Sequence, residues 1–127
     1  MRHQFRKHYS REEARSLLPQ IRGWLAQLAH HRDRLAKLER RLAPLLASGH
    51  DVGGATTNEL LRCLAQFRTL LNEFHQREIQ VKDLDRGLID FPALIGGREV
   101  FLCWEQDEDD IEFWHELDTG YAGRERL

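Results

Sequence analysis

The strongest constraint on the fold is a heptad repeat in the first half of the chain. Two interleaved sets of residues each recur every seven positions: Ile21, Leu28, Leu35 and Leu42, and Trp24, His31, Leu38 and Leu45. This spacing is typical of the a and d positions of a helix that packs lengthwise on another helix. His31 is the polar residue of the repeat, and we expect it to be a tolerated core or interface residue that can fix register or oligomeric state. The repeat predicts a long helix that ends near Ala47, just after Pro44.

The start of this helical region carries a capping signal and a proline. Ser10 and Glu13 have the spacing of a capping box, which predicts a helix that begins at Arg11. Pro19 cannot donate the backbone hydrogen bond that a helix interior requires. We therefore expect a short helix over Arg11–Leu18, a break or kink, and then the long helix from Pro19.

A second helical segment follows a glycine-containing loop. Residues 48–55 include three glycines and little apolar surface, which is typical of a loop. Thr56 or Thr57 is expected to cap a helix over about residues 58–80. Its stripe has spacings of three and four residues: Leu60, Leu64, Phe67, Leu71, Phe74 and Glu78. The two helices are expected to form an antiparallel hairpin over about residues 11–80.

From Val81 onward the pattern changes to that of β structure. Gly87 and the pair Gly96-Gly97 separate apolar runs, and the glycine pair predicts a hairpin turn. Residues 100–104 are apolar on both faces, as in a covered central strand, whereas Pro92 indicates an edge or bulged strand. We predict an α+β fold in one domain, residues 1–127. It consists of a short N-terminal helix, a long antiparallel helical hairpin, and a small antiparallel sheet of two or three strands within about residues 81–127.

Composition excludes several classes of protein. Hydrophobic residues make up 41% and charged residues 31% of the chain, and no apolar run approaches the roughly 20 residues that cross a bilayer. We expect a cytoplasmic protein with no membrane association, no secretion signal, and Cys63 and Cys103 as reduced thiols. Residues 1–50 carry eleven Lys and Arg against four Asp and Glu, whereas residues 51–127 carry eight against seventeen. The basic half could attract nucleic acid, but we expect the two halves to complement each other, within a chain or across a dimer, and predict no specific nucleic-acid binding.

Polar residues beside bulky apolar residues in the last third of the chain are the candidates for a site. The candidate ligand-binding residues are Asp83, Asp90, Cys103, Trp104, Trp114, His115 and Arg124. We expect the tryptophans and Phe91 to share one small core and to draw the polar residues together at its rim. A carboxylate there needs a cationic or donor partner, and His115 and Arg124 are the expected partners of Asp90. A purely structural alternative is a clasp in which Arg124 of the tail pairs with Asp83 or Asp90.

Two metal sites are compatible with these residues. Glu112 and His115 have the Glu-x-x-His spacing that places two ligands on one helical face, and together with Asp118 they are the metal candidates. Cys103 and His115 with an aspartate would instead form a mixed sulfur, nitrogen and oxygen zinc site.

Two further chemistries remain open. The thiol of Cys103 could act as a nucleophile with the neighbouring imidazole and with Asp90 or Asp118. Alternatively, Arg124 and Lys82, with the same imidazole, could hold a carboxylate or a phosphate.

Five segments of the last third occur in a recognisable order: Val81-Lys82-Asp83, Gly87 to Ala93, Val100 to Trp104, Trp114-His115-Glu116 and Gly120 to Arg124. With the opening segment Ser10 to Pro19, they make the chain similar to a bacterial family known as domain of unknown function 2203, over nearly its whole length. The resemblance implies a bacterial cytosolic protein with no assigned activity. It implies these motif positions: Asp83, Gly87, Asp90, Phe91, Pro92, Leu102, Cys103, Trp104, Glu108, Trp114, His115, Asp118, Gly120 and Arg124. The acidic run around Glu108 is denser than the usual connector of the family, which argues against an individual role for Glu108.

Two functions from different classes follow. The first is a non-catalytic binding or protein-interaction module that forms a homodimer through its helices. A helix of about 29 residues spans about 43 Å, longer than a small sheet can cover, and Leu17 and Leu46 widen its apolar stripe. The alternative is a small metal- or ligand-binding enzyme that uses the polar cluster around Asp90, Cys103 and His115, and that takes a small-molecule or anionic ligand.

Overall fold

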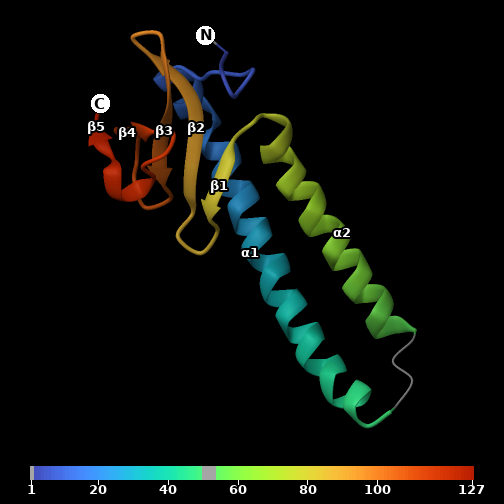
Figure 1. Ribbon diagram of the computed structural model, residues 1–127. Coiled ribbons are helices and arrows are strands. Elements are labelled where there is room, and N and C mark those ends of the chain that lie inside the picture. Colours follow the sequence, from blue (N-terminus) through green and yellow to red (C-terminus); the bar gives the residue numbers. More distant parts are fainter. Residues whose placement is uncertain (1, 50–53) are drawn as a thin grey trace.

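The computed structural model describes residues 2–49 and 54–127, and it contains two long helices with a five-stranded sheet at one end of them (Figure 1). The elements follow in this order: α1 (Arg11–Ala47), α2 (Ala55–Gln76), β1 (Gln80–Asp83), β2 (Leu88–Ile95), β3 (Arg98–Glu105), β4 (Phe113–Glu116), the 3₁₀ helix η1 (Tyr121–Gly123) and β5 (Glu125–Arg126). The sheet is antiparallel with its strands in sequence order. The α+β class is therefore confirmed. The expectation of two or three strands is wrong, because the short strands β1, β4 and β5 extend the central β2–β3 hairpin on both sides.

Helix α1 is continuous, so the expected short helix that breaks at Pro19 is wrong. Its start is as predicted: the Ser10 hydroxyl accepts a hydrogen bond from the Glu13 amide, and the Glu13 carboxylate accepts one from the Ser10 amide. Pro19 lies inside the helix at an exposed position, where water can reach the carbonyl group that loses its donor. The buried stripe continues on both sides of it through Leu18 and Ile21. Burial of each such side chain stabilises the fold by about 1.5–3 kcal/mol. The buried side chains together therefore offset the roughly 3 kcal/mol that a proline inside a helix costs.

Helix α2 begins and ends earlier than expected. It starts at Ala55 after Gly54, so Thr56 and Thr57 lie inside the first turn rather than at the cap. It ends at Gln76, and Glu78, expected within its stripe, has left the helix with a left-handed φ of 59°. Both helices lie side by side and run in opposite directions (Figure 1). The expected loop over residues 48–55 falls partly outside the described residues.

The β2–β3 hairpin is the centre of the sheet. It turns at Gly96 and Gly97, whose φ angles of 59° and 78° are those of the two-residue turn that a glycine pair favours. Strand β1 pairs with β2 only as far as Asp90, so Pro92 lies where β2 has become an edge. Beyond that point the Tyr9 amide donates to the Pro92 carbonyl and covers the edge. The predicted hairpin and the edge position of Pro92 are both confirmed.

Both faces of the β2–β3 hairpin are buried. Alternate residues face the helices and join the main core with the first half of α1: Ile89, Phe91, Ala93, Val100, Leu102 and Trp104. Trp114 of β4 is partly buried against the same core, so the expected common core of the two tryptophans and Phe91 is confirmed. The expectation that the polar residues lie at the rim of this core is wrong, because strand alternation directs Asp90, Cys103 and His115 to the opposite face. The intervening residues point to the opposite face, which the C-terminal segment covers (Figure 1). This second, covered face carries the polar residues described below.

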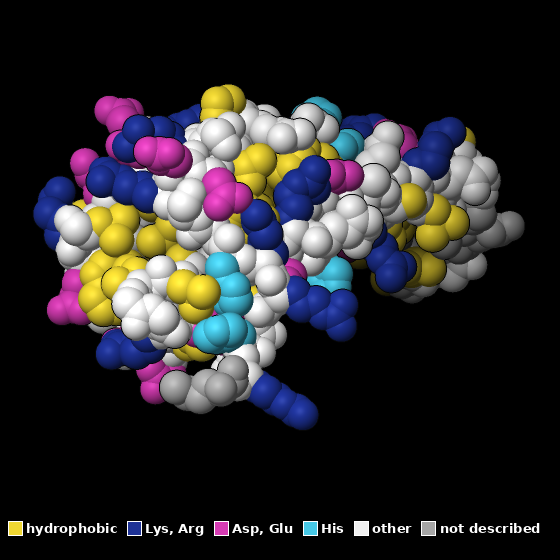
Figure 2. All heavy atoms as spheres, turned by 90° about the horizontal axis from the view of Figure 1, so that it is seen from above, with side chains coloured by type: hydrophobic (Ala, Val, Ile, Leu, Met, Phe, Trp, Pro, Cys, Tyr) yellow, Lys and Arg dark blue, Asp and Glu magenta, His cyan; other side chains and the backbone are white. Residues whose placement is uncertain are grey.

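The basic and acidic halves of the chain pair with each other. Arg11 and Arg15 of α1 form ion pairs with Asp110, and Arg32 pairs with Asp85. Figure 2 accordingly shows Lys and Arg side chains next to Asp and Glu side chains across the viewed face. The expected charge complementarity is present within one chain. Among the described residues, neither helix combines the length and apolar character needed to span a bilayer.

Candidate functional site

A cluster of three buried polar side chains lies on the sheet face turned away from the helices. Asp90, Cys103 and His115 come from the neighbouring strands β2, β3 and β4, and the strand register pairs Asp90 directly with Cys103. One ligand atom of each, a carboxylate oxygen, the Sγ and an imidazole nitrogen, lies within 4.8 Å of the other two. We call these residues the Asp–Cys–His cluster. Its members are 2%, 0% and 1% exposed, respectively, so all three lie inside the protein.

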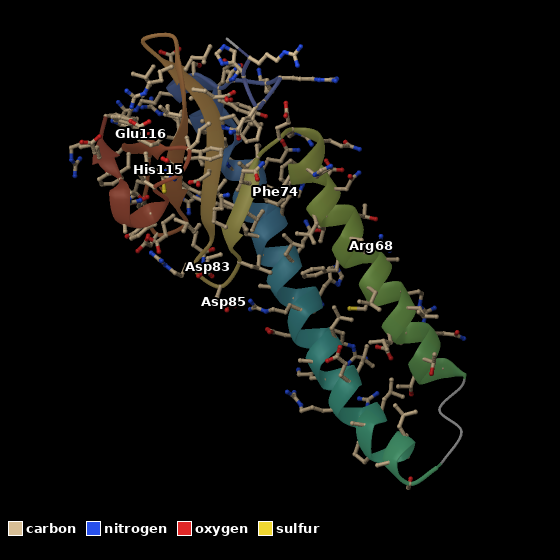
Figure 3. The ribbon with its side chains drawn as sticks, in the orientation of Figure 1. Arg68, Phe74, Asp83, Asp85, His115 and Glu116 are labelled. Atoms are coloured by element: carbon tan, nitrogen blue, oxygen red, sulfur yellow. The ribbon has the colours of Figure 1, made fainter. Side chains whose placement is uncertain are left out.

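The orientation of His115 is fixed by a hydrogen bond to the backbone. Its Nδ1 lies 2.6 Å from the carbonyl oxygen of Glu116, and its Nε2 lies 2.9 Å from Oδ2 of Asp90. A carbonyl can only accept, so Nδ1 carries a hydrogen and donates it. The Nε2 atom therefore points toward the other two members of the cluster, and it shares a proton with the Asp90 carboxylate. His115 and Glu116 project from the strand that lies on the far side of the sheet from α2 (Figure 3).

The carboxyl group of Asp90 is only half satisfied. Its Oδ1 atom is buried and accepts no hydrogen bond of good geometry among the described residues, although the Cys103 thiol is close enough to interact with the carboxyl group. Burial raises the pKa of Asp90 above its ordinary value, although the nearby His115, Cys103 and Lys82 act in the opposite direction. A buried acceptor that is left without any partner costs on the order of 1–3 kcal/mol.

The thiol of Cys103 is protonated at neutral pH. Burial, followed by the nearby Asp90, raises its pKa to about 12, and Nη1 of Arg124 at 3.9 Å opposes this only partly. A nucleophilic cysteine needs a thiolate and access to a substrate, and Cys103 has neither. This disfavours the interpretation of Cys103 as a nucleophile.

The cluster forms part of the wall of a cavity of about 320 Å³. Asp90 and His115 line it directly, and Cys103 lies beside Asp90 on the neighbouring strand β3. The other lining residues come from β1 to β3 and from the segment after β4: Lys82, Leu88, Phe101, Leu117, Asp118, Thr119, Gly120 and Tyr121. This volume is in the range of small-molecule sites, about 300–1,000 Å³. A larger crevice of about 440 Å³ lies beside Tyr9, but its polar groups already pair with each other, as Lys7 does with Glu13.

Arg124 closes the C-terminal segment through a partner that the sequence did not suggest. Its guanidinium donates to both carboxylate oxygens of Glu108, at 3.1 and 2.8 Å, and lies over the rings of Phe113 and Tyr121. The expected pairing with an aspartate of β1 or β2 is therefore wrong. Glu108 is also held by the Glu105 amide, at 2.8 Å, in the turn after β3. The expectation that Glu108 has no individual role is wrong, and its spacing of three residues from the strand end was the signal that could have identified it.

Several other candidates lie away from the cluster. Asp83 accepts a hydrogen bond from the Arg86 amide in the β1–β2 turn, and lies apart from His115 (Figure 3). Trp104 faces the helices, with its Nε1 donating to the Glu108 carbonyl. Trp104 and Trp114 therefore belong to the helix-facing core and not to the cavity wall.

The metal candidate built on Glu112 rests on a wrong local structure. Residues 113–116 form strand β4 rather than a helix, so Glu112 and His115 do not share a helical face. In a strand, a spacing of three residues directs two side chains to opposite faces. Glu112 lies beside Arg126 at 3.9 Å, and Asp118 is an exposed residue at the edge of the cavity.

Comparison with known proteins gives one match. A family model described as an uncharacterized conserved protein, DUF2203, matches residues 7–127, which confirms the resemblance inferred from the sequence. No curated protein and no solved structure matches the chain. The geometry of the cavity is therefore the basis for any functional assignment.

Proposed function

For a chain that belongs to the uncharacterized conserved family DUF2203, we propose a metal-binding function: the Asp–Cys–His cluster binds one divalent transition-metal ion of the zinc type. The observation that carries this proposal is Oδ1 of Asp90, a buried acceptor without a partner among the described residues, in a cluster with an imidazole and a thiol. A metal ion would satisfy this acceptor. Nitrogen, sulfur and oxygen ligands in one site are the set that zinc prefers.

The charges of the cluster support a dication. Asp90 and Cys103 contribute two negative charges when both are deprotonated, and a divalent ion neutralises them. Neutrality matters because all three side chains are buried, where an unbalanced charge is costly. Zinc also deprotonates a coordinating thiol, which removes the obstacle set by the high pKa of Cys103.

The geometry requires only a small adjustment. Zinc bonds of about 2.0–2.3 Å place two ligand atoms roughly 3.3–3.8 Å apart. The three ligand atoms already lie within 4.8 Å of one another, and the Nε2 to Oδ2 contact at 2.9 Å must open as the ion displaces the shared proton. The hydrogen bond from Nδ1 of His115 to the Glu116 carbonyl leaves Nε2 free to bind, as is common for ligating histidines.

Loading the purified full chain with metal tests the proposal. After treatment with a chelator, we expect the protein to bind one Co²⁺ per chain with a thiolate-to-cobalt charge-transfer band, and Zn²⁺ to displace the Co²⁺. The variant Cys103→Ser should lose the band. The matched control Cys63→Ser, which removes the other buried thiol, should retain it. A folded wild-type protein that binds no stoichiometric metal, or a band that survives in Cys103→Ser, would contradict the proposal; circular dichroism verifies the fold of each variant.

We propose, as a second property, that the helix pair forms a homodimer. It is favoured by large apolar side chains that are exposed on these helices: Leu45, Leu46, Leu61, Leu64 and Leu71. The core that contains the sheet residues reaches Leu28 of α1 and Leu70 of α2, and the sheet leaves the part of the helix pair beyond them uncovered (Figure 1). A second copy is the expected occupant because two antiparallel helix pairs can bury the same surface in a four-helix arrangement.

Light scattering at tens of micromolar tests the dimer. The wild-type protein should have twice the mass of the chain, and Leu61→Glu, at a residue that is 58% exposed, should be monomeric and folded. Leu94→Glu, at an exposed leucine of β2, is the matched control and should remain dimeric. A monomeric wild-type protein would overturn this proposal without affecting the metal site.

A further inference from the structure

We infer that the proposed metal site is open, and that its remaining coordination position takes a small carboxylate anion whose second oxygen pairs with Lys82. This inference rests on the metal-binding function proposed above and adds the class of ligand. Three protein ligands leave one position of a tetrahedral ion for a water molecule or an exogenous ligand.

The open position faces the cavity. Asp90 and His115 line the cavity, and Cys103 lies beside Asp90 on the neighbouring strand. An ion held by all three therefore borders the cavity on the side of Asp90 and His115. The cavity volume of about 320 Å³ is large enough for an organic molecule and not only for a water.

Lys82 is the group that selects the charge of the ligand. It lines the same cavity, with its ammonium group 5.3 Å from the centre of the Phe101 ring. Within residues 2–49 and 54–127 it forms no ion pair with a carboxylate inside 4 Å, in contrast to Arg86 of the β1–β2 turn, which pairs with Glu105. Its positive charge acts on Asp90, which places the two groups within electrostatic reach.

Charge balance points to a monoanion. Once a dication has neutralised Asp90 and Cys103, Lys82 is the positively charged side chain that lines the cavity, at an exposed position of β1. A carboxylate can bind the metal with one oxygen and the ammonium group with the other. Asp118, exposed at the edge of the cavity, disfavours a ligand with a second negative charge, such as a phosphate dianion.

The apolar part of the cavity wall defines the rest of the ligand. Leu88, Phe101 and Leu117 line the cavity beside the polar groups. Such a wall favours a short hydrocarbon portion attached to the carboxylate, because burial of each CH₂ group contributes about 0.8 kcal/mol. A short-chain carboxylate therefore fits this site better than an inorganic anion does.

Titration of the cobalt-loaded full-length protein with acetate tests this inference. We expect acetate to shift the visible cobalt bands in a saturable manner, butyrate to bind more tightly than acetate, and inorganic phosphate to bind more weakly. Lys82→Gln should weaken acetate binding about tenfold while it leaves the Co²⁺ affinity unchanged. The matched control Lys37→Gln, at an exposed lysine of α1, should behave as the wild-type protein.

The outcomes separate the two proposals. If the wild-type protein gives no cobalt band, the metal-binding function itself is refuted. If the band forms but does not respond to acetate, or if the response is equal in Lys82→Gln, the metal site stands and the carboxylate inference is overturned. A phosphate that binds more tightly than acetate would also overturn it.

Discussion

Replacement of Asp90 by asparagine distinguishes a functional site from a structural clasp. In the metal-free protein Asp90 is 2% exposed, with one oxygen bonded to His115 and the other without a partner among the described residues. Asparagine has nearly the same shape and carries no charge to desolvate. Because Nδ1 of His115 holds a hydrogen, its Nε2 can accept a hydrogen bond from the new amide group. We expect Asp90→Asn to increase the free energy of unfolding of the metal-free protein by about 1 kcal/mol.

Urea denaturation with a chelator present measures this change, which corresponds to a rise of about 4 °C in Tm. Asp90→Ala should instead lower the free energy of unfolding by about 1–3 kcal/mol, because it leaves Nε2 of His115 unpaired. Zinc at 100 times its Kd should add about 2.7 kcal/mol to the wild-type protein and nothing to Asp90→Asn. The exposed Asp107→Asn is the control and should change neither value. A loss of more than about 2 kcal/mol in metal-free Asp90→Asn would refute the reasoning and identify the cluster as a clasp.

Three other predictions concern the tail, the N-terminal segment and the metal. Arg124→Ala should lower the free energy of unfolding, measured in urea, by about 1–3 kcal/mol. Arg124→Lys should not restore the lost stability, because a lysine cannot bond both oxygens of Glu108. An unchanged urea midpoint of Arg124→Ala would contradict this prediction. Burial opposes ionisation of Glu99, but hydrogen bonds from His8, Gln4 and Phe5 outweigh the effect of burial and lower the pKa of Glu99 below 4.5. The ionised Glu99 therefore stabilises the folded protein above pH 4.5, and this stabilisation is lost as the pH falls through the lower pKa of the folded state. Glu99→Gln should flatten the pH dependence measured between about pH 5 and pH 3. Calorimetry in buffers of different ionisation enthalpy should find about two protons released per zinc ion, one from the thiol and one shared by the carboxylate and the imidazole; a release near zero would contradict thiolate ligation.

The parts of the fold that the sequence predicted correctly depend on local chemistry. The capping box at Ser10 and the turn at Gly96-Gly97 each require particular residues at fixed spacing, so they could be identified without tertiary information. The continuity of α1 through Pro19 could not, because it depends on apolar partners in the sheet that outweigh a local penalty. Strand β5 could not either, since Glu125 and Arg126 carry no apolar alternation and are held by pairing with β4.

The same division applies to the candidate site. Asp90, Cys103 and His115 were identified because each lies next to a bulky apolar residue. In the structure, the alternation of side chains along three strands directs all three to one face. Glu108 was missed because an acidic run hides one specific carboxylate among solvated ones. Glu112 was wrongly grouped with His115 because a helical period was assumed where a strand forms. The partner of Glu108, Arg124, is distant in sequence. The segment from Glu112 to His115 is only four residues long, and over four residues a helical and a strand period cannot be told apart.

The position of the cluster argues that the fold alone does not require it. Asp90, Cys103 and His115 occupy the middle of three adjacent strands, on a face where Phe101 and Pro92 are also buried. Apolar residues of similar size at these positions would remove an unpartnered acceptor and a desolvated carboxyl group, and such replacements are commonly neutral or stabilising. The Glu108–Arg124 pair already holds the C-terminal segment over this face, so the cluster is not needed as a clasp. A buried polar cluster that the fold does not need, and that lines a cavity of ligand size, is best explained by what enters the cavity.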